Sequence, residues 1–282
     1  NTTGSAGVAL GKSALQVNTT GANNNAIGYL AMRFNTTGGS NVAVGRQALY
    51  ENTTASNNVA VGNNALKSNT TGAQNTACGA DNLNSNTTGS HNTAFGYDPL
   101  DSNTTGNENT AIGAYSLKLN TTGSQNTAGG YSALYNHTTG GSHTAFGYQA
   151  LYASQTNEYN TAVGHQCLYA ATTGSRNTCM GRAAGSNITT GGHNIYIGYN
   201  TQASSASVQE EFVLGYSANG KGTRTFFTSA DNGVYHGGNT TTWSTTSDRR
   251  IKKNIVDNNE GLSLINQIAV KNFEYKTAEE IE

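Results

Sequence analysis

Asparagine side chains recur in this sequence at a spacing that makes them candidates for two kinds of chemistry. Each Asn-Thr-Thr triplet is formally an acceptor for N-glycosylation, as are the triplets that start at Asn136, Asn187 and Asn239. An asparagine at a fixed corner of a repeat can instead bond backbone groups, or stack in a ladder with its copies. Because the same residues return at every corner, turn chemistry is the favoured interpretation. A tetrapeptide close to Asn-Thr-Thr-Gly begins at Asn1, Asn18, Asn35, Asn52, Asn69, Asn86, Asn103 and Asn120.

Tyrosines also recur in register and form the candidate binding residues. Tyr29, Tyr97, Tyr131 and Tyr148 share one position of the repeat. A second position carries Tyr50, Tyr135, Tyr152 and Tyr169. Columns of exposed aromatic rings can stack on sugars at a host surface, which makes the first set the candidate binding site. Packing against neighbouring subunits is the alternative, and we favour it over sugar binding.

The cysteines and acidic residues do not predict a metal or cofactor site. Cys78 takes an apolar position of the repeat and Cys179 replaces an alanine, so both are expected to be small buried hydrophobic residues. A disulfide between Cys167 and Cys179 stays open. Calcium-binding β-rolls need a regular aspartate, whereas the repeats contain aspartate at Asp81, Asp98 and Asp101. We therefore expect no metal and no cofactor.

Composition excludes two classes of partner. The formal net charge is −1, 11% of the residues are charged, and the repeats contain no basic run, so nucleic acid is not an expected partner. No stretch of 18 apolar residues is present, so membrane insertion is not expected. The chain opens on a complete repeat unit, and we expect it to be a piece of a longer polypeptide.

The element that must position these side chains is a 17-residue repeat. After Asn120 the tetrapeptide degenerates in the same register, at His137, Ser154, Ala171 and Ile188. No insertion or deletion interrupts the units, so each unit is expected to occupy one identical step of a stack. Seventeen residues are too few for a pair of helices. The repeat therefore predicts a parallel β-solenoid or β-roll with one unit per coil.

Each unit predicts one short strand and a thin core. After the second Asn come Thr or Val, Ala, an apolar residue and Gly, which alternates as a strand does between turn residues. We predict a second extended segment around the Ala-Leu pair. We place Leu and the apolar residue inside, and leave the Ala and Gly face for another rod to approach. The predicted interior column contains Ile27, Val44, Val61, Phe95, Ile112 and Phe146.

These patterns predict an all-β fold with three regions. Residues 1–204 form the solenoid shaft, residues 205–246 a degenerate last coil and a β-rich connector, and residues 247–282 a small α+β segment. With coils about 4.8 Å apart, the shaft would be on the order of 55–60 Å long. Only 35% of the residues are hydrophobic, and a rod with so thin a core gains stability by association. We expect a homotrimer.

The repeat strand resembles the head repeats of trimeric autotransporter adhesins. The similarity lies in residues 24–28 (Asn-Asn-Ala-Ile-Gly), 41–45 (Asn-Val-Ala-Val-Gly) and 109–113 (Asn-Thr-Ala-Ile-Gly). In that family such segments build a left-handed parallel β-roll. The resemblance implies homotrimers in which each rod packs against two others.

The C-terminal segment resembles the intramolecular chaperone of endosialidase-type phage tail spikes and fibres. Residues 247–255 match its Ser-Asp-x-Arg-x-Lys-x-x-Ile pattern, and a helix-like stretch at 261–268 leads to Phe273-Glu-Tyr-Lys276. The resemblance implies trimer assembly followed by self-cleavage before Ser247, with Ser247 as nucleophile and Lys252 as its base. A serine hydroxyl needs such a base, and lysine serves when burial lowers its pKa. A solvated basic turn is the alternative.

Together these features predict a viral or phage-like attachment fibre, located on the virion or at a cell surface, with itself and a host-surface glycan or protein as partners. The alternative is a cellular surface filament or matrix protein that carries the same module. Ice binding ranks last, because adjacent threonines of a strand point to opposite faces. Beyond self-cleavage, no enzymatic activity is expected.

Overall fold

A computed structural model describes residues 3–5, 7–228, 234–237 and 244–245. Their strands form one sheet in which the spatial order follows the chain order. The strands are β1 (Val8–Leu10), β2 (Asn25–Ile27), β3 (Val42–Val44), β4 (Val59–Val61), β5 (Thr76–Cys78), β6 (Thr93–Phe95), β7 (Thr110–Ile112), β8 (Thr127–Gly129), β9 (Thr144–Phe146), β10 (Thr161–Val163), β11 (Thr178–Met180), β12 (Ile195–Ile197), β13 (Phe212–Leu214), β14 (Thr225–Thr228), β15 (Val234–Gly237) and β16 (Ser244–Thr245).

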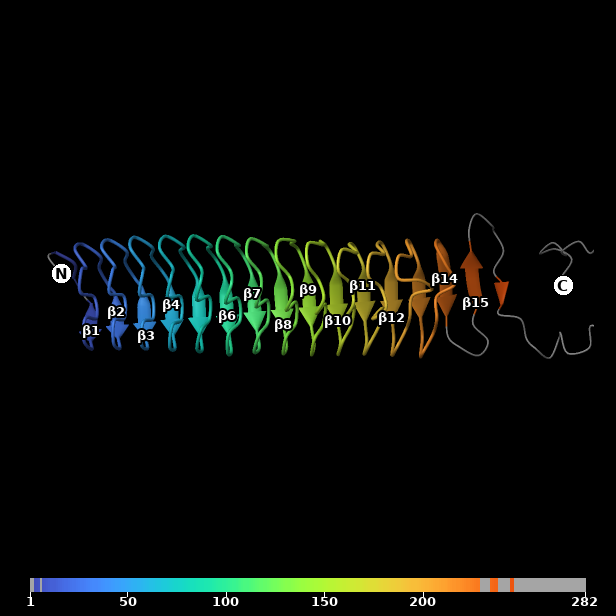
Figure 1. Cartoon of the computed structure of the whole chain (residues 1–282), viewed down its shortest axis with the longest axis horizontal. Coiled ribbons are helices and arrows are strands. Elements are labelled where there is room, and N and C mark those ends of the chain that lie inside the picture. Colours follow the sequence, from blue (N-terminus) through green and yellow to red (C-terminus); the bar gives the residue numbers. More distant parts are fainter. Residues whose placement is uncertain (1–2, 6, 229–233, 238–243, 246–282) are drawn as a thin grey trace, which may run out of the picture. The chain divides into compact units, whose positions relative to one another are not determined.

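The sheet is a parallel β-solenoid. From β1 to β13 every strand pairs in parallel with the strand 17 residues further along, as Ala26 pairs with Ala43 and Ala43 with Ala60. Figure 1 shows these strands side by side, all running in the same direction, with one turn of chain between neighbours. The predicted fold class and the 17-residue coil are confirmed, with about 13 turns.

The predicted orientation of the strand is wrong. From β2 to β13 each strand points its middle residue inward, and from β2 to β10 this residue is an alanine, fully buried from Ala26 to Ala162. Ile27, Val61, Phe95, Ile112 and Phe146 do form one column, but it lies on the outer face with side chains 36% to 49% exposed, and Val44 in the same column is half-buried. Cys78 belongs to this column and is likewise half-buried rather than part of the core. The Ala face is therefore inside the coil and not available to a second rod.

The core consists of strand alanines facing leucines from the following turn. Leu49, Leu66, Leu83 and Leu100 are fully buried, as predicted. Their segment is a turn and not the predicted second strand, because the leucines of the repeat adopt left-handed φ values of 48° to 54°. That conformation is strained for a residue with a branched side chain. Burial of the leucine and a bond from its N–H to the next coil, such as Leu49 to Ala65 O at 3.0 Å, offset the strain.

A second turn position requires glycine. Gly45 has a φ of 140°, and a Cβ built on it would lie 2.3 Å from the carbonyl oxygen of Gly62 in the next coil. Successive coils approach so closely at this corner that no side chain fits. The same contact recurs along the stack, which explains why Gly follows the strand in each unit.

The regular repeat ends after β13, where the sequence also loses its register. Phe212 of β13 pairs with Phe226 of β14, only 14 positions on, and β14, β15 and β16 pair antiparallel. Here larger side chains replace the core alanine: Tyr196, Val213 and Phe227 are all buried. The Tyr196 hydroxyl donates to Glu211 Oε2 at 2.7 Å. The chain divides into two units, residues 1–246 and residues 247–282.

Candidate functional site

The first Asn of each unit forms a ladder along the interior corner of the coils. Asn35 Nδ2 donates to Asn18 Oδ1 at 2.7 Å and to Gly38 O, within its own coil, at 3.0 Å. Asn52 repeats the pattern onto Asn35 at 2.8 Å. We call this the first ladder; its members are Asn18, Asn35, Asn52, Asn69, Asn86, Asn103 and Asn120.

The second Asn of each unit forms a parallel ladder that meets the first at one atom. Asn24 Oδ1 accepts from Asn41 N at 3.0 Å, and Asn24 Nδ2 donates to Gly38 O at 2.7 Å. Gly38 O thus receives one amide from each ladder. This second ladder runs through Asn24, Asn41, Asn58, Asn75, Asn92, Asn109 and Asn126.

The ladders decide between the two chemistries of the Asn-Thr-Thr triplets. The triplet asparagines from Asn35 to Asn120 are completely buried and their amides donate to protein oxygens. Thr36 O accepts hydrogen bonds from the N–H groups of Thr19 and Thr20, at 2.9 and 3.2 Å, and from the Thr19 hydroxyl at 2.9 Å. The triplet is therefore corner chemistry, and its amides are closed to glycosylation in the folded coil. Asn239 lies outside the described residues.

One coil replaces both ladder asparagines by histidine. His137 and His143 are buried with ring centroids 4.8 Å apart at 87°. Asn160 N donates to His143 Nδ1 at 3.1 Å, so Nδ1 is the acceptor, and Nε2 donates to Asn157 O at 2.9 Å. Burial, and secondly the neighbouring His137, lower the pKa of His143 to about 3. Burial also lowers the pKa of His137. The 17-residue register already places both histidines at ladder positions, but the sequence analysis did not identify them as a pair.

The cysteines and acidic groups do not form a metal site in the described residues, where no cluster of three or more His, Cys, Asp or Glu side chains could hold an ion. Cys167 and Cys179 are buried free thiols, and no disulfide joins them. Burial, followed by the hydrogen bond with Cys167, raises the pKa of Cys179. These thiols are packed core groups.

The tyrosines form two rows on the outside of the coil. In the first row Tyr131 stacks on Tyr148, with ring centroids 5.5 Å apart and an interplanar angle of 9°. In the second row Tyr135 stacks on Tyr152 at 5.4 Å and 19°. Of the four candidate binding residues, Tyr131 and Tyr148 are thus neighbours. Tyr29 lies many coils away and has no such partner row, because Arg33 takes the place of a second-row tyrosine.

Tyr115 joins the two rows, although sequence reasoning missed it. Its ring meets Tyr131 at 5.7 Å and 89° and Tyr135 at 6.5 Å and 65°. Tyr97, the remaining candidate, contacts the same ring at 5.5 Å and 89°. Tyr115 stands one residue beyond the register of the first row, so a search for an exact column passes over it. That single shift turns two rows into one cluster.

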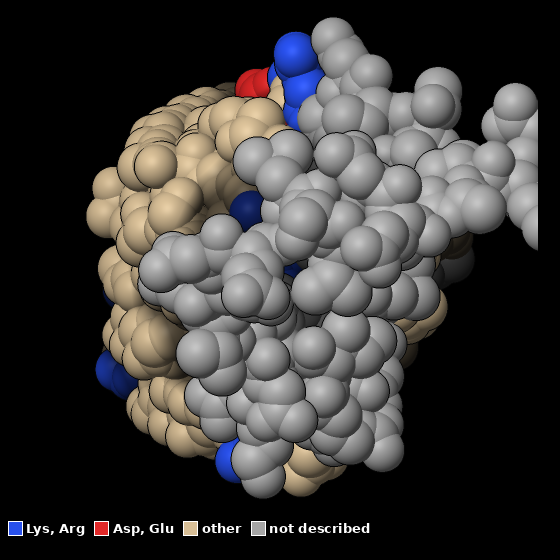
Figure 2. Space-filling view, turned by 90° about the vertical axis from the view of Figure 1, so that its right-hand side faces the viewer, with Lys and Arg blue, Asp and Glu red and all other residues tan. Residues whose placement is uncertain are grey.

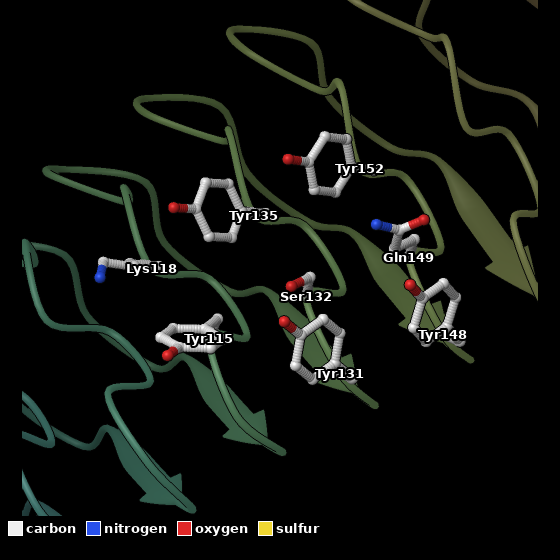
Figure 3. Close-up of a pocket in the computed structure, with 8 residues that line it drawn as sticks. All are labelled: Tyr115, Lys118, Tyr131, Ser132, Tyr135, Tyr148, Gln149 and Tyr152. Carbon is white, nitrogen blue, oxygen red and sulfur yellow. The ribbon is translucent and has the colours of Figure 1, made fainter.

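The rows enclose a groove of about 470 Å³. Ser132 lies between Tyr131 and Tyr135, and Gln149 lies between Tyr148 and Tyr152, while Tyr115 lies across one end (Figure 3). Lys118, beside Tyr115, forms an ion pair with Asp98 at 2.5 Å and sits over the Tyr115 ring at 5.0 Å. Its hydrogen bond to Asp98 raises the pKa of Lys118. The groove therefore has aromatic walls, a polar floor and a neutralised cation at one end.

The predicted catalytic residues Ser247 and Lys252 lie outside the described residues, so no geometry bears on their roles. Sequence comparison identifies the segment that contains them. Residues 247–282 match the Peptidase_S74 family, the chaperone of endosialidase. This match covers the C-terminal segment and not the solenoid. Comparison with curated proteins and with solved structures finds no match to this chain. Among the described residues no helix is both long and apolar enough to cross a membrane.

Proposed function

We propose that this chain is the shaft of a trimeric attachment fibre, exposed on a virion or a cell surface and assembled by its C-terminal chaperone segment. The observation that carries the proposal is the combination, in one chain, of a regular β-solenoid with the Peptidase_S74 match at residues 247–282. Chaperones of this family act in trimeric fibre proteins. The low content of charged residues, 11% of the chain, is consistent with this role. In the end view of Figure 2 the described surface is mostly tan, with separate groups of Lys and Arg atoms and a small acidic group.

The outward apolar column supports association of three copies. It runs along the stack because each strand pairs in register with the next, although β8 has Gly129 at this position. Its exposed residues include Leu10, Ile27, Val61, Phe95, Ile112, Phe146, Met180 and Leu214. A contiguous exposed apolar strip is unusual on a protein that stays monomeric. Since the column is straight and repeats at each coil, parallel copies in register can cover one another's strips.

Light scattering after size exclusion tests the assembly. The full chain is compared with the double variant Ile112→Glu/Phe146→Glu, which puts two charges into the column, and with Thr88→Glu/Thr105→Glu as control. The control threonines are exposed on the corner turns of neighbouring coils. We expect trimers for the wild type and the control, and monomers with unchanged circular dichroism for the column variant. A monomeric wild type at micromolar concentration contradicts the proposal.

The chaperone segment adds a proposed maturation step. The Ser247 hydroxyl attacks the carbonyl carbon of Thr246 while Lys252 Nζ accepts its proton. The peptide bond opens as the Ser247 nitrogen leaves with a proton, and water then hydrolyses the resulting ester. The products are a shaft ending at Thr246 and a free segment beginning at Ser247.

A cellular surface filament is the second candidate, because the same solenoid and chaperone serve a fibre without a virus. Neighbouring genes that encode capsid or baseplate proteins favour the viral fibre, and their absence from a complete locus favours the cellular filament.

A further inference from the structure

We propose that the groove between the two tyrosine rows binds a neutral, linear oligosaccharide lying along the axis of the shaft. The groove is defined by Tyr131 and Tyr148 on one wall, Tyr135 and Tyr152 on the other, and Tyr115 across the end. This inference deepens the proposed attachment role by naming a site and a ligand class.

The double aromatic row is confined to a few coils, which marks it as a discrete site. It includes the pairs Tyr131 with Tyr135, Tyr148 with Tyr152, and His165 with Tyr169. Among the other described coils none has an aromatic ring at both positions: Tyr29, Tyr97, Tyr199 and Tyr216 of the first row are matched by Arg33, Asp101, Ala203 and Gly220, and Tyr50 of the second row is matched by Arg46. A contact between parallel shafts would use the same position in nearly every coil, as the apolar column does, with Gly129 of β8 as its exception. The tyrosine rows do not fit that use.

The groove is built to receive a ligand with both apolar and hydroxyl groups. Tyrosine offers an apolar ring with a polar tip, and Tyr131 and Tyr148 are 47% and 44% exposed. On the floor, Gln149 Oε1 accepts from Gln166 at 3.1 Å. Gln149 Nε2 and Ser132 Oγ have no partner among the described residues and so can bond a ligand. Sugar rings present C–H surfaces bordered by hydroxyls, which match these walls and this floor.

The charge of the groove selects a neutral ligand. Lys118, the lysine beside the groove, is already paired with Asp98. The Tyr152 phenol is neutral at physiological pH, and burial, followed by the neighbouring Tyr169, raises its pKa further. No uncompensated cation is left among the lining residues to balance a sialic acid or a sulfate. The volume of about 470 Å³ lies within the usual range of small-ligand sites, about 300–1,000 Å³.

The experiment screens the full chain on immobilised pentasaccharides built of glucose, galactose or N-acetylglucosamine, each with a sialylated or sulfated counterpart. Calorimetry then measures the affinity of the neutral pentasaccharide that binds. We expect Tyr131→Ala and Tyr152→Ala each to weaken binding by about tenfold or more, since each removes one of the two rings of a wall. Tyr29→Ala is the matched control, because Tyr29 belongs to the first-row register but has no second row beside it, and its affinity should equal that of the wild type.

Melting temperatures verify that the variants are folded, and Tyr131→Phe supplies a variant that keeps the ring. Three outcomes overturn the inference: no neutral pentasaccharide binds, the acidic counterparts bind more tightly, or the groove variants bind as well as the wild type. Dissociation of the trimer by Tyr131→Ala, without any sugar binding, would identify the groove as a subunit contact instead. Binding is measured independently of oligomeric state, so a monomeric wild type contradicts the fibre assembly while leaving the groove tested on its own.

Discussion

The imidazoles of His137 and His143 lie edge to face inside one coil, 4.8 Å between ring centroids, at the two positions where other coils carry ladder asparagines. Asparagine is neutral at every pH, whereas histidine takes up a proton below its pKa. Protonation of His143 would place an Nδ1–H against the Asn160 N–H, which already donates to that atom. The pair of rings thus turns one layer of a pH-insensitive stack into a titratable one.

We predict that the solenoid loses stability in acid because of this layer. Both folded pKa values lie below the ordinary value of 6.5, that of His143 at about 3. The unfolded chain therefore binds more protons, and stability is complete above about pH 6.5 and falls as the pH drops toward 3, by roughly 3 kcal/mol between pH 7 and pH 4. His137→Asn/His143→Asn should flatten the dependence of the melting temperature on pH. The control is His91→Asn, which replaces an exposed histidine and should leave the pH dependence of the melting temperature unchanged. If the melting temperature of the wild type and of both variants depends equally on pH, the prediction is wrong.

A second prediction concerns the ladders. Asn92 Oδ1 accepts from Asn109 N at 3.0 Å, and Asn92 Nδ2 donates to Gly106 O at 2.9 Å. Both hydrogen bonds are buried and join neighbouring coils. Asn92→Ala leaves a buried N–H without its acceptor and should lower stability by roughly 2–4 kcal/mol. The urea midpoint measures the change. The exposed Asn107 is the control, and Asn107→Ala should cost less than about 1 kcal/mol; similar losses for both would show that burial does not decide the energy.

A third prediction separates the two reasons for glycine at the corner of the coil, which are its positive φ and the close approach of the next coil. Gly113 and Gly222 have nearly equal φ values of 123° and 122°, but a Cβ on Gly113 would lie 2.8 Å from the backbone of Gly130, while none of the described atoms lies within 4 Å of a Cβ on Gly222. Gly222→Ala should cost about 1–2 kcal/mol through backbone strain alone. Gly113→Ala adds the clash and should cost more than about 3 kcal/mol or prevent folding. Thermal melting measures the loss of stability in each variant. Equal losses would mean that neighbouring coils move apart to accommodate the Cβ of residue 113 without a measurable loss of stability.

A fourth prediction concerns maturation. Mass spectrometry of the chain with its native C-terminus should detect two species separated at the Thr246–Ser247 bond. Ser247→Ala and Lys252→Ala should each remain intact, whereas the neighbouring Lys253→Ala should be cut like the wild type. A wild type that stays whole after prolonged incubation would mean that the segment is a permanent cap.

The sequence alone determined the stack and its chemistry at the corners. A period of 17 residues without insertions requires identical coils, because one extra residue would misalign every later layer. The corner glycines and the ladder asparagines could be read from the same period, since glycine tolerates positive φ and identical amides in register bond one another. The resemblance of residues 247–282 to the chaperone of endosialidase was likewise visible in the sequence, and the family match supports it.

Only the tertiary structure decided which face of the strand is inside. Alternation shows that Ala111 and Ile112 point to opposite faces, but it does not say which face is the interior. The more hydrophobic residue was the natural choice and the wrong one, because Leu117, turned inward by its left-handed backbone, already fills the coil and leaves room for a methyl group. The groove followed from the same folding: Tyr131 and Tyr135 are four residues apart, and the turn between them sets the two rows on opposite sides of Ser132. Periodicity records which residues align along the axis, whereas the path of the chain within one coil sets what faces inward and what meets across a groove.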